Sequence, residues 1–430
     1  MRTITIGFYG MTHLGLVSAV AAASKDCQVI AYDANQTLID ALKKQNYPIE
    51  EPNFRELMAH YTDRIEFTSH LESLKKADLI YVAIDVPTDD KNTSHLQPIA
   101  DALYQLSTQL NSEQMVVVLS QIPPGFTRKI SFPQAQLFYQ VETLIFGRAV
   151  ERASKPERLI VGCADPSQPL PSVYRDFLSR FNCPILTLRY ESAELAKIAI
   201  NFYLVSSVMT SNLLADVAST VGAEWQEITP TLRLDQRIGP YAYLDPGLGI
   251  SGGNLERDMM TIHRLAQIHH VQANLIDTWL HDSDYYKNWV WRCLKTHVLS
   301  KMKAPTIAIL GLAYKANTHS TKNSPSMSLI ERLKETHARL QLHDPVVKHP
   351  DAHASAFDAL NSADVLVIMT PWSEYSTLTV SDLSNRMREK IIIDPFRVLK
   401  HSEFIQANFL IYTLGVNLNR EKEVKKAHHV

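Results

Sequence analysis

The stretch that decides the fold class is Ile4-Thr5-Ile6-Gly7-Phe8-Tyr9-Gly10-Met11-Thr12-His13-Leu14-Gly15. Its apolar residues alternate toward Gly7, as in a strand that runs into a turn, and glycines recur up to residue 15. Residues 14–23 are then nearly all apolar and predict a buried helix, and residues 28–33 predict a second strand that ends in Asp33. The order strand, glycine turn, helix and strand indicates an α/β fold.

Two further apolar runs, residues 78–83 and 115–119, extend this pattern through the first 185 residues. Near-continuous apolar runs are typical of parallel strands that are buried on both faces. We therefore expect a doubly wound parallel sheet with right-handed crossovers.

The middle of the chain has a different character. Residues 191–221 contain no proline or glycine and predict one long helix, which is too apolar all round for a surface helix and is expected at a domain or subunit interface. Residues 255–300 are expected to continue in helix, and residues 306–336 again predict strand, glycine turn and helix. Further strands are predicted at residues 339–343, 364–369 and 390–394, and a frayed tail is expected from Arg420.

The predicted architecture is therefore α/β, with two Rossmann-like doubly wound domains joined by a long central helix and a helical middle domain. We expect a doubly wound N-terminal domain over residues 1–187, a central helical domain over residues 188–300 and a C-terminal Rossmann-like domain over residues 301–430.

Composition excludes several classes of protein. The chain has 430 residues, with 43 Lys and Arg against 45 Asp and Glu, so no excess of positive charge is available for nucleic acid. No two of its four cysteines lie within four residues of each other, which argues against a zinc site or a disulfide framework and fits a reducing compartment. Apart from the apolar start of the chain, which the strand and helix explain, no span of about 18 uncharged apolar residues is expected. We expect a cytoplasmic protein without a metal site or a membrane span.

The turn from Gly10 to Gly15 stands where a dinucleotide-binding G-x-G-x-x-G sequence would stand, but Thr12 replaces the middle glycine. That glycine normally lets the backbone approach a pyrophosphate at the helix N-terminus. Asp33 follows Gly10 by 23 residues, and an acid there binds ribose hydroxyls and favours NAD over NADP. The alternative is a glycine turn that packs a domain without a bound nucleotide.

Polar residues interrupt the apolar central helix. Lys197 and Asn201 are four residues apart and share one face, with Glu194 one turn earlier. Lys197 could donate to an oxygen in a closed site that Asn201 helps to position. Alternatively, Lys197 reaches the surface and Asn201 is a satisfied interface amide.

A glycine-rich loop, residues 246–253, precedes Asn254, and Asp258 follows one turn later. The loop could cradle a ligand that Asn254 and Asp258 face, and Asn254 could also serve as a helix cap. Arg237 lies upstream and could clamp a phosphate or form a surface ion pair.

These motifs resemble the UDP-glucose/GDP-mannose dehydrogenase family over nearly the full chain. The matching stretches, in order, are Y-P-I-E-E-P at residues 47–52, I-P-P-G-F-T at 122–127, Glu142 with Gly147 and Pro156-Glu157-Arg158, E-L-A-K-I-A-I-N at 194–201, D-Q-R-I-G at 235–239, G-L-A-Y-K at 311–315, Ser324-Pro325, Asp344-Pro345, T-P-W at 370–372 and Asp394. The resemblance implies two NAD-dependent oxidations of the 6-hydroxymethyl group of a nucleotide-linked sugar, through a cysteine thiohemiacetal and thioester. It also implies that residues 1–187 bind NAD, that residues 188–300 form a dimerisation and substrate domain, and that residues 301–430 bind the nucleotide-sugar. A homodimer formed through the central helix is implied as well.

The resemblance assigns roles to residues of this chain. The implied catalytic positions are Lys197, Asn201, Asp258, Glu142 and Asn254. The implied cofactor-binding positions are Gly7, Gly10, Thr12, His13, Leu14, Gly15, Asp33, Pro87 and Gln121. The implied substrate-binding positions are Arg237, which is expected to reach the neighbouring subunit's nucleotide-sugar, and Gly249, Gly252, Gly253, Lys315 and Arg397.

The chain departs from the family pattern at several of these positions. Asn254 occupies the position of the family's cysteine, and a carboxamide is no nucleophile at neutral pH. The other departures are Arg257 for a lysine, Gln121 and Val86 for threonines, Phe146 for an acid and Lys322 for an arginine.

Three hypotheses follow. The first is an NAD-dependent nucleotide-sugar oxidoreductase that stops at the aldehyde, or proceeds slowly through its hydrate. The second is redox-neutral chemistry such as epimerisation with retained NAD. The third is a non-catalytic relative that binds a nucleotide or a partner.

Overall fold

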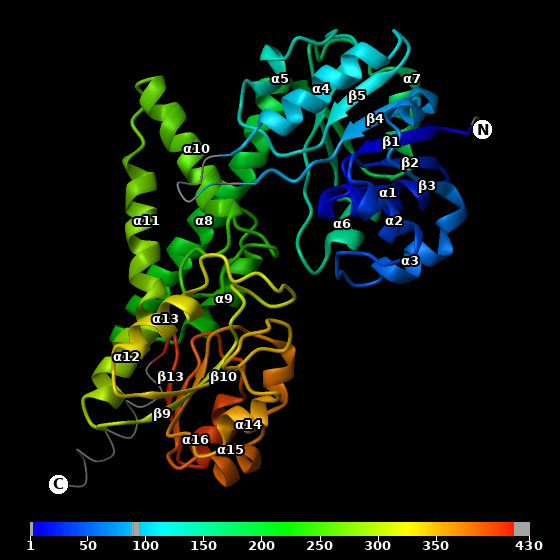
Figure 1. The fold of residues 1–430 in the computed structure, drawn as a ribbon. Coiled ribbons are helices and arrows are strands. Elements are labelled where there is room, and N and C mark those ends of the chain that lie inside the picture. Colours follow the sequence, from blue (N-terminus) through cyan, green and yellow to red (C-terminus); the bar gives the residue numbers. More distant parts are fainter. Residues whose placement is uncertain (1–2, 88, 90–93, 417–430) are drawn as a thin grey trace, which may run out of the picture. The chain divides into compact units, whose positions relative to one another are not determined.

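The computed structural model describes residues 3–87, 89 and 94–416, and it divides the chain into two compact units, residues 1–200 and 201–430 (Figure 1). The boundary falls inside the long helix α8 (Tyr190–Val221). The expected three-domain division at residues 187 and 300 therefore stays a prediction. The frayed tail predicted from Arg420 lies outside the described residues.

The first unit contains an eight-stranded sheet in the order β3-β2-β1-β4-β5-β6-β7-β8. Its strands are β1 (Thr5–Tyr9), β2 (Gln28–Tyr32), β3 (Ile65–Thr68), β4 (Leu79–Val82), β5 (Met115–Val118), β6 (Leu137–Gln140), β7 (Leu159–Cys163) and β8 (Ile185–Arg189). Every neighbouring pair is parallel except β6 and β7. The predicted doubly wound sheet is confirmed, with one antiparallel pair near its edge.

Alternation along the strands divides the side chains between two apolar layers. Val29 and Ala31 of β2 belong to one layer, and Ile30 and Tyr32 belong to the other. The first layer is covered by α1 (His13–Ala23), α2 (Gln36–Lys43), α3 (Phe54–His60), α6 (Ala149–Ser154) and α7 (Ser172–Ser179). The second is covered by η2 (Leu71–Lys76), α4 (Gln97–Gln109) and the first turn of α8. Both faces of the sheet are thus buried, as its apolar strands require.

The second unit begins with helices. After α8 come α9 (Trp225–Leu234), α10 (Asn254–Ile268), α11 (Asn274–Lys287), α12 (Trp289–Leu294) and a π-helical turn, η3 (Lys295–Leu299). The helix expected over residues 255–300 is therefore several shorter helices with breaks between them.

A five-stranded parallel sheet follows, in the order β10-β9-β11-β12-β13. Its strands are β9 (Thr306–Leu310), β10 (Arg339–His343), β11 (Val365–Ile368), β12 (Ile391–Ile393) and β13 (Leu410–Tyr412). Helices α12 and α13 (Pro325–Lys334) pack on one face, and α14 (Ala356–Leu360), α15 (Val380–Arg386) and α16 (His401–Gln406) pack on the other. The second predicted α/β sheet is confirmed.

Helix α8 corrects one expectation. An 18-residue window within it has a mean hydropathy of 1.4 and is only 33% buried, so by length and composition alone it could cross a membrane. The expectation that no such stretch exists was wrong for this helix. A long helix that packs at an interface has the same length and composition.

Candidate active site

The glycine turn after β1 has the backbone of a dinucleotide-binding turn. Gly10 has φ of 101° and donates its amide to the carbonyl of Tyr32 at 2.8 Å. A Cβ at Gly15 would lie 1.8 Å from the Gly10 oxygen, so only glycine permits this approach of helix and turn. Gly7 lies inside β1, where a Cβ would come within 2.8 Å of Leu74. This contact gives Gly7 a packing reason besides the predicted cofactor role.

The acid at the end of β2 is tied to this turn. Asp33 accepts the amide of Met11 at 2.8 Å through one carboxylate oxygen and that of Asn35 at 2.9 Å through the other. The side chain is half-buried, and each oxygen can accept a second bond. Asp33 is therefore fixed in place and still able to accept hydroxyl groups of a ribose.

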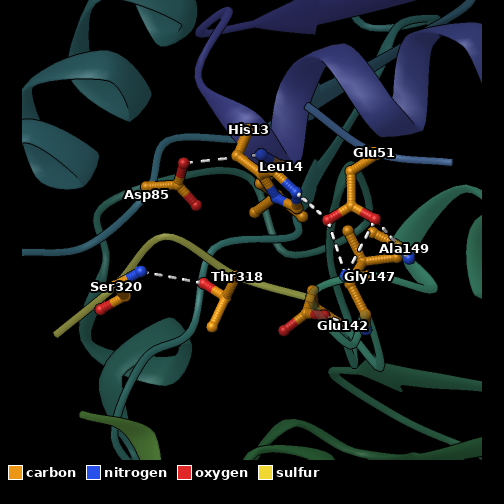
Figure 2. A network of polar contacts seen from close by, with 10 residues as sticks. His13, Leu14, Glu51, Asp85, Glu142, Gly147, Ala149, Thr318 and Ser320 are labelled. Carbon is orange, nitrogen blue, oxygen red and sulfur yellow. Dashed lines mark hydrogen bonds and ion pairs between the residues drawn. The ribbon is translucent and has the colours of Figure 1, made fainter. Parts of the chain in front are cut away.

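Thr12, in place of the middle glycine, turns its hydroxyl toward the end of β4. The hydroxyl donates to the carbonyl of Ala83 at 3.3 Å and accepts the amide of Asp85 at 3.2 Å. The Asp85 carboxylate in turn lies 3.5 Å from the amide of Leu14, in the first turn of α1 (Figure 2). The Thr12 hydroxyl is thus engaged within the protein.

His13 joins the start of α1 to a buried carboxylate. Its Nε2 lies 2.9 Å from Glu51, whose side chain is 1% exposed (Figure 2). Glu51 also accepts the amides of Gly147, at 3.0 and 3.1 Å, and Ala149, at 3.1 Å. The ring of His13 packs on Phe146 with 4.6 Å between centroids. Glu51 therefore fixes the loop that begins at Glu142 against the glycine turn at residues 10–15, which is called the cofactor turn below.

The remaining cofactor candidates lie at neighbouring strand ends. Pro87 follows β4 and Gln121 follows β5, and these strands are parallel to each other and to β1. Ser120 links the two ends by accepting the amide of Ile84 at 3.0 Å and donating to its carbonyl at 2.7 Å. Apart from Gly7, which lies inside β1, the predicted cofactor residues thus gather at the carboxyl edge of one sheet, where α/β folds bind nucleotides.

Lys197 forms an ion pair with Glu142 in the first unit. The Nζ to Oε2 distance is 3.3 Å, and the two side chains are 11% and 16% exposed. The apolar environment makes this partner necessary for a charged lysine. Structure therefore brings together two of the predicted catalytic residues.

Glu194 has a separate role. Its carboxylate, fully buried, accepts the amides of Gly125 at 2.6 Å and Thr127 at 2.9 Å. Burial raises the pKa of Glu194, although both backbone bonds oppose the shift. Glu194 therefore fixes the turn before α5 (Phe126–Lys129).

In the second unit, Asn201 donates to Asp258 at 2.5 Å. Asp258 is 2% exposed and also lies 3.3 Å from the Nε of Arg257, itself 7% exposed. The half-buried Asn201 thus joins α8 to the buried Asp258 and Arg257 of α10. Asn254, the first residue of α10, is exposed.

The glycines of the 246–253 loop have packing roles in the second unit. A Cβ at Gly249 would meet the Ser283 carbonyl at 2.4 Å, and one at Gly252 would meet the Tyr314 ring at 2.7 Å. Gly253 is contacted by Lys322, at 3.2 Å from its ideal Cβ. The predicted ligand role of these glycines stays a prediction.

The other substrate candidates are distributed over the second unit. Arg237 has an 89% exposed side chain that pairs with Asp235 at 2.7 Å. Lys315 has its Nζ 5.7 Å from the ring centroid of Tyr314. Arg397 has φ of 55°, and its buried Nη1 has no hydrogen-bond partner within the described chain.

Burial raises the pKa of all four thiols. For Cys27 it reaches about 11 and for Cys293 about 12, and the pKa values of Cys163 and Cys183 also rise. None of these cysteines therefore supplies a thiolate at neutral pH. Within the described ranges, no three or more His, Cys, Asp or Glu side chains form a group that could hold a metal ion.

Sequence reasoning missed two residues at the cofactor turn, Glu51 and Asp85. Glu51 lies in the segment at residues 47–52, between a second acid and a proline. These sequence neighbours do not indicate that its side chain is buried. Asp85 lies just after the strand predicted at residues 78–83. Ligand-binding residues of α/β folds often lie at such strand ends, so this position was the available signal.

Comparisons with known proteins agree with this geometry. Three family models match the chain: the NAD binding domain of the UDP-glucose/GDP-mannose dehydrogenase family at residues 4–178, its central domain at 191–282 and its UDP binding domain at 308–401. UDP-glucose 6-dehydrogenase from Rickettsia prowazekii is 26% identical, covering 96% of this chain and 99% of that protein. The same enzyme from Rhizobium meliloti is 27% identical over 95% and 99%.

Solved structures support the fold. A UDP-glucose dehydrogenase from Pyrobaculum islandicum aligns with a TM-score of 0.80 at 23% identity, covering 94% of this chain and 96% of that one. A UDP-D-ManNAc dehydrogenase from Pyrococcus horikoshii aligns with a TM-score of 0.82 at 21% identity, covering 96% and 99%. The glycine turn, the strand-end acid and the three matched domains lead to one conclusion: the chain belongs to the UDP-glucose/GDP-mannose dehydrogenase family and has its NAD-binding domain.

Proposed function

We propose that this protein oxidises the C6 hydroxymethyl of a UDP- or GDP-linked sugar with NAD, without a covalent thioester step. The family indicates NAD-dependent nucleotide-sugar dehydrogenase activity. One observation supports the assignment of this activity to particular residues of the chain. Lys197 and Asn201 lie one turn apart on α8, and each is bonded to a carboxylate, Glu142 and Asp258.

The first oxidation needs a donor for the reacting oxygen and an acceptor for its proton. NAD, held at the glycine turn with Asp33 beside its ribose, would supply the hydride acceptor for C6. The Lys197 ammonium and the Asn201 amide donate to the oxygen and stabilise its developing negative charge. The hydroxyl proton passes to Glu142, or through a water molecule to Asp258. The alcohol thus becomes an aldehyde: the hydride goes to NAD and the hydroxyl proton goes to a carboxylate.

The second oxidation lacks its usual nucleophile. Asn254 stands at the family's cysteine position and cannot form a thiohemiacetal. The raised pKa values of Cys27 and Cys293 keep these thiols protonated. We therefore expect the aldehyde to be the main product, with slow oxidation of its hydrate when water adds to C6.

Counting NADH tests the proposal. Purified protein is incubated with NAD and a panel of UDP- and GDP-sugars, starting from UDP-glucose, and NADH per sugar consumed is measured. We expect one equivalent, with aldehyde trapped by a hydrazide reagent. A rapid second equivalent contradicts the proposal. A changed sugar without NADH indicates epimerisation, and an unchanged sugar indicates a binding role.

An engineered thiol gives the matched comparison. Asn254→Cys is expected to form a second equivalent of NADH per sugar. Asn254→Ser is not expected to do so, because serine is similar in size to cysteine but is a weaker nucleophile. If the two variants form the same amount of NADH per sugar consumed, Asn254 does not occupy the reacting position.

We also propose that the protein forms a homodimer through α8. The exposed large apolar side chains of α8 are Leu195, Tyr203, Leu213, Leu214, Val217 and Val221. Those of the following segment include Leu234, Ile238, Tyr241 and Tyr243. Several of those on α8 repeat at helical spacing and form a stripe. Light scattering should give a dimer mass that Val217→Glu reduces to a monomer. A cytoplasmic location is the accompanying expectation.

A further inference from the structure

A negatively charged side chain lies at the start of the cofactor helix. Asp85 follows β4, and its Oδ2 is 3.5 Å from the amide of Leu14 in the first turn of α1 (Figure 2). Its own amide donates to the Thr12 hydroxyl at 3.2 Å, and that hydroxyl donates to the Ala83 carbonyl. The backbone of residue 85 is therefore held beside the glycine turn.

The first turn of α1 carries the positive end of the helix dipole and amides without helical partners. Thr12 makes no side-chain capping bond there. The first turn contains no acidic residue of its own, and the Asp85 carboxylate adds negative charge beside it. In dinucleotide-binding folds the pyrophosphate binds at this end of the helix after the glycine turn.

We propose that Asp85 sets the affinity for NAD by occupying the pyrophosphate position until the dinucleotide displaces it. The side chain is exposed, so it can turn to solvent while the Thr12 contacts hold the backbone. The charge of Asp85 stabilises the NAD-free protein and weakens NAD binding. This inference rests on NAD binding and does not depend on the sugar reaction.

Titration calorimetry with NAD, in the absence of sugar, tests the proposal. Asp85→Asn is expected to bind NAD about three- to tenfold more tightly than the natural protein at low salt. The gain should shrink at high salt, where exposed charges are screened. Asp85→Glu keeps the charge and should change the affinity by less than about twofold. Glu113→Gln removes one exposed negative charge before β5, at the opposite edge of the sheet, and should also leave it unchanged.

The melting temperature supplies the second readout. Without NAD, Asp85→Asn should melt about 1–3 °C lower, because α1 loses its capping charge. With saturating NAD, the two melting temperatures should converge, because the dinucleotide has then displaced Asp85 from the helix end of the natural protein. Unchanged or weaker NAD binding by Asp85→Asn overturns the proposal, as does a failure of every variant to bind NAD. If the sugar assay fails while this affinity gain appears, only the proposed sugar reaction is wrong.

Discussion

The two glycine turns of the molecule share one backbone design. Gly10 follows β1 and Gly311 follows β9, both with φ of 101°. Each glycine donates its amide, at 2.8 Å, to the last residue of the neighbouring strand, Tyr32 in one case and His343 in the other. An aspartate comes next in both units, and its carboxylate accepts an amide directly after the glycine.

The two aspartates differ in how many donors they serve. Asp33 accepts two backbone amides and stays half-buried. Asp344 is 8% exposed and accepts five donors: the amides of Leu312, Ala313, Val346 and Val347 and the indole of Trp372. The helix also starts three residues after Gly10 but 14 residues after Gly311. An acid at the end of a strand can thus bind a ligand or stabilise the fold. The number of hydrogen bonds that its carboxylate can still accept distinguishes the two cases.

The largest effect should come from the saturated acid. Asp344→Asn places an amide group among buried donors, so two or more of them lose their acceptor. We expect a loss of about 3–5 kcal/mol in the free energy of unfolding, measured in urea. Asp33→Asn is the matched control and should lose less than about 1 kcal/mol. Equal losses would remove the distinction between the two acids.

Glu51 extends the comparison within the first unit, since it is also buried and saturated. Glu51→Gln should cost about 2–3 kcal/mol, because the amides of Gly147 and Ala149 and the ring of His13 lose a charged acceptor. If Glu51 also positions Glu142, the variant should lower kcat while the affinity for nucleotide-sugar stays constant. A stability change without an effect on kcat would limit Glu51 to the fold.

Local patterns were sufficient for most of the fold. The alternation at residues 4–9, the spacing of Gly10 and Gly15 and the acid at Asp33 all act within about 30 residues, where sequence periodicity is informative. Glu51 was missed because its partners, His13 and Gly147, are 38 and 96 residues away. Glu194 was grouped with Lys197 by helical spacing, yet its carboxylate binds the turn at Gly125 and Thr127, which no periodicity encodes.

The half-buried acid should affect the ligand more than the fold. Asp33→Asn is expected to weaken NAD binding about tenfold, because an ionised acceptor for ribose hydroxyls is lost. Discrimination against NADP should decrease in the same variant, since a 2′-phosphate no longer meets a negative charge. Calorimetry with both dinucleotides measures the two effects. An unchanged ratio of affinities would mean that Asp33, like Asp344, serves only the turn.

The smallest predicted effect is a pH dependence at Glu194, in addition to the constant loss from the backbone amide that Glu194→Gln leaves without an acceptor. Burial raises its pKa in the folded protein above the ordinary 4.5, so the native state binds a proton that the unfolded state has already released. Its contribution to stability is therefore complete below pH 4.5 and is lost as the pH rises through the raised pKa. The unfolding free energy of the natural protein relative to Glu194→Gln should fall across that window, since the glutamine does not titrate. A difference that grows with pH would show that the bonds from Gly125 and Thr127 outweigh burial, and that Glu194 belongs with the acids held charged by backbone amides.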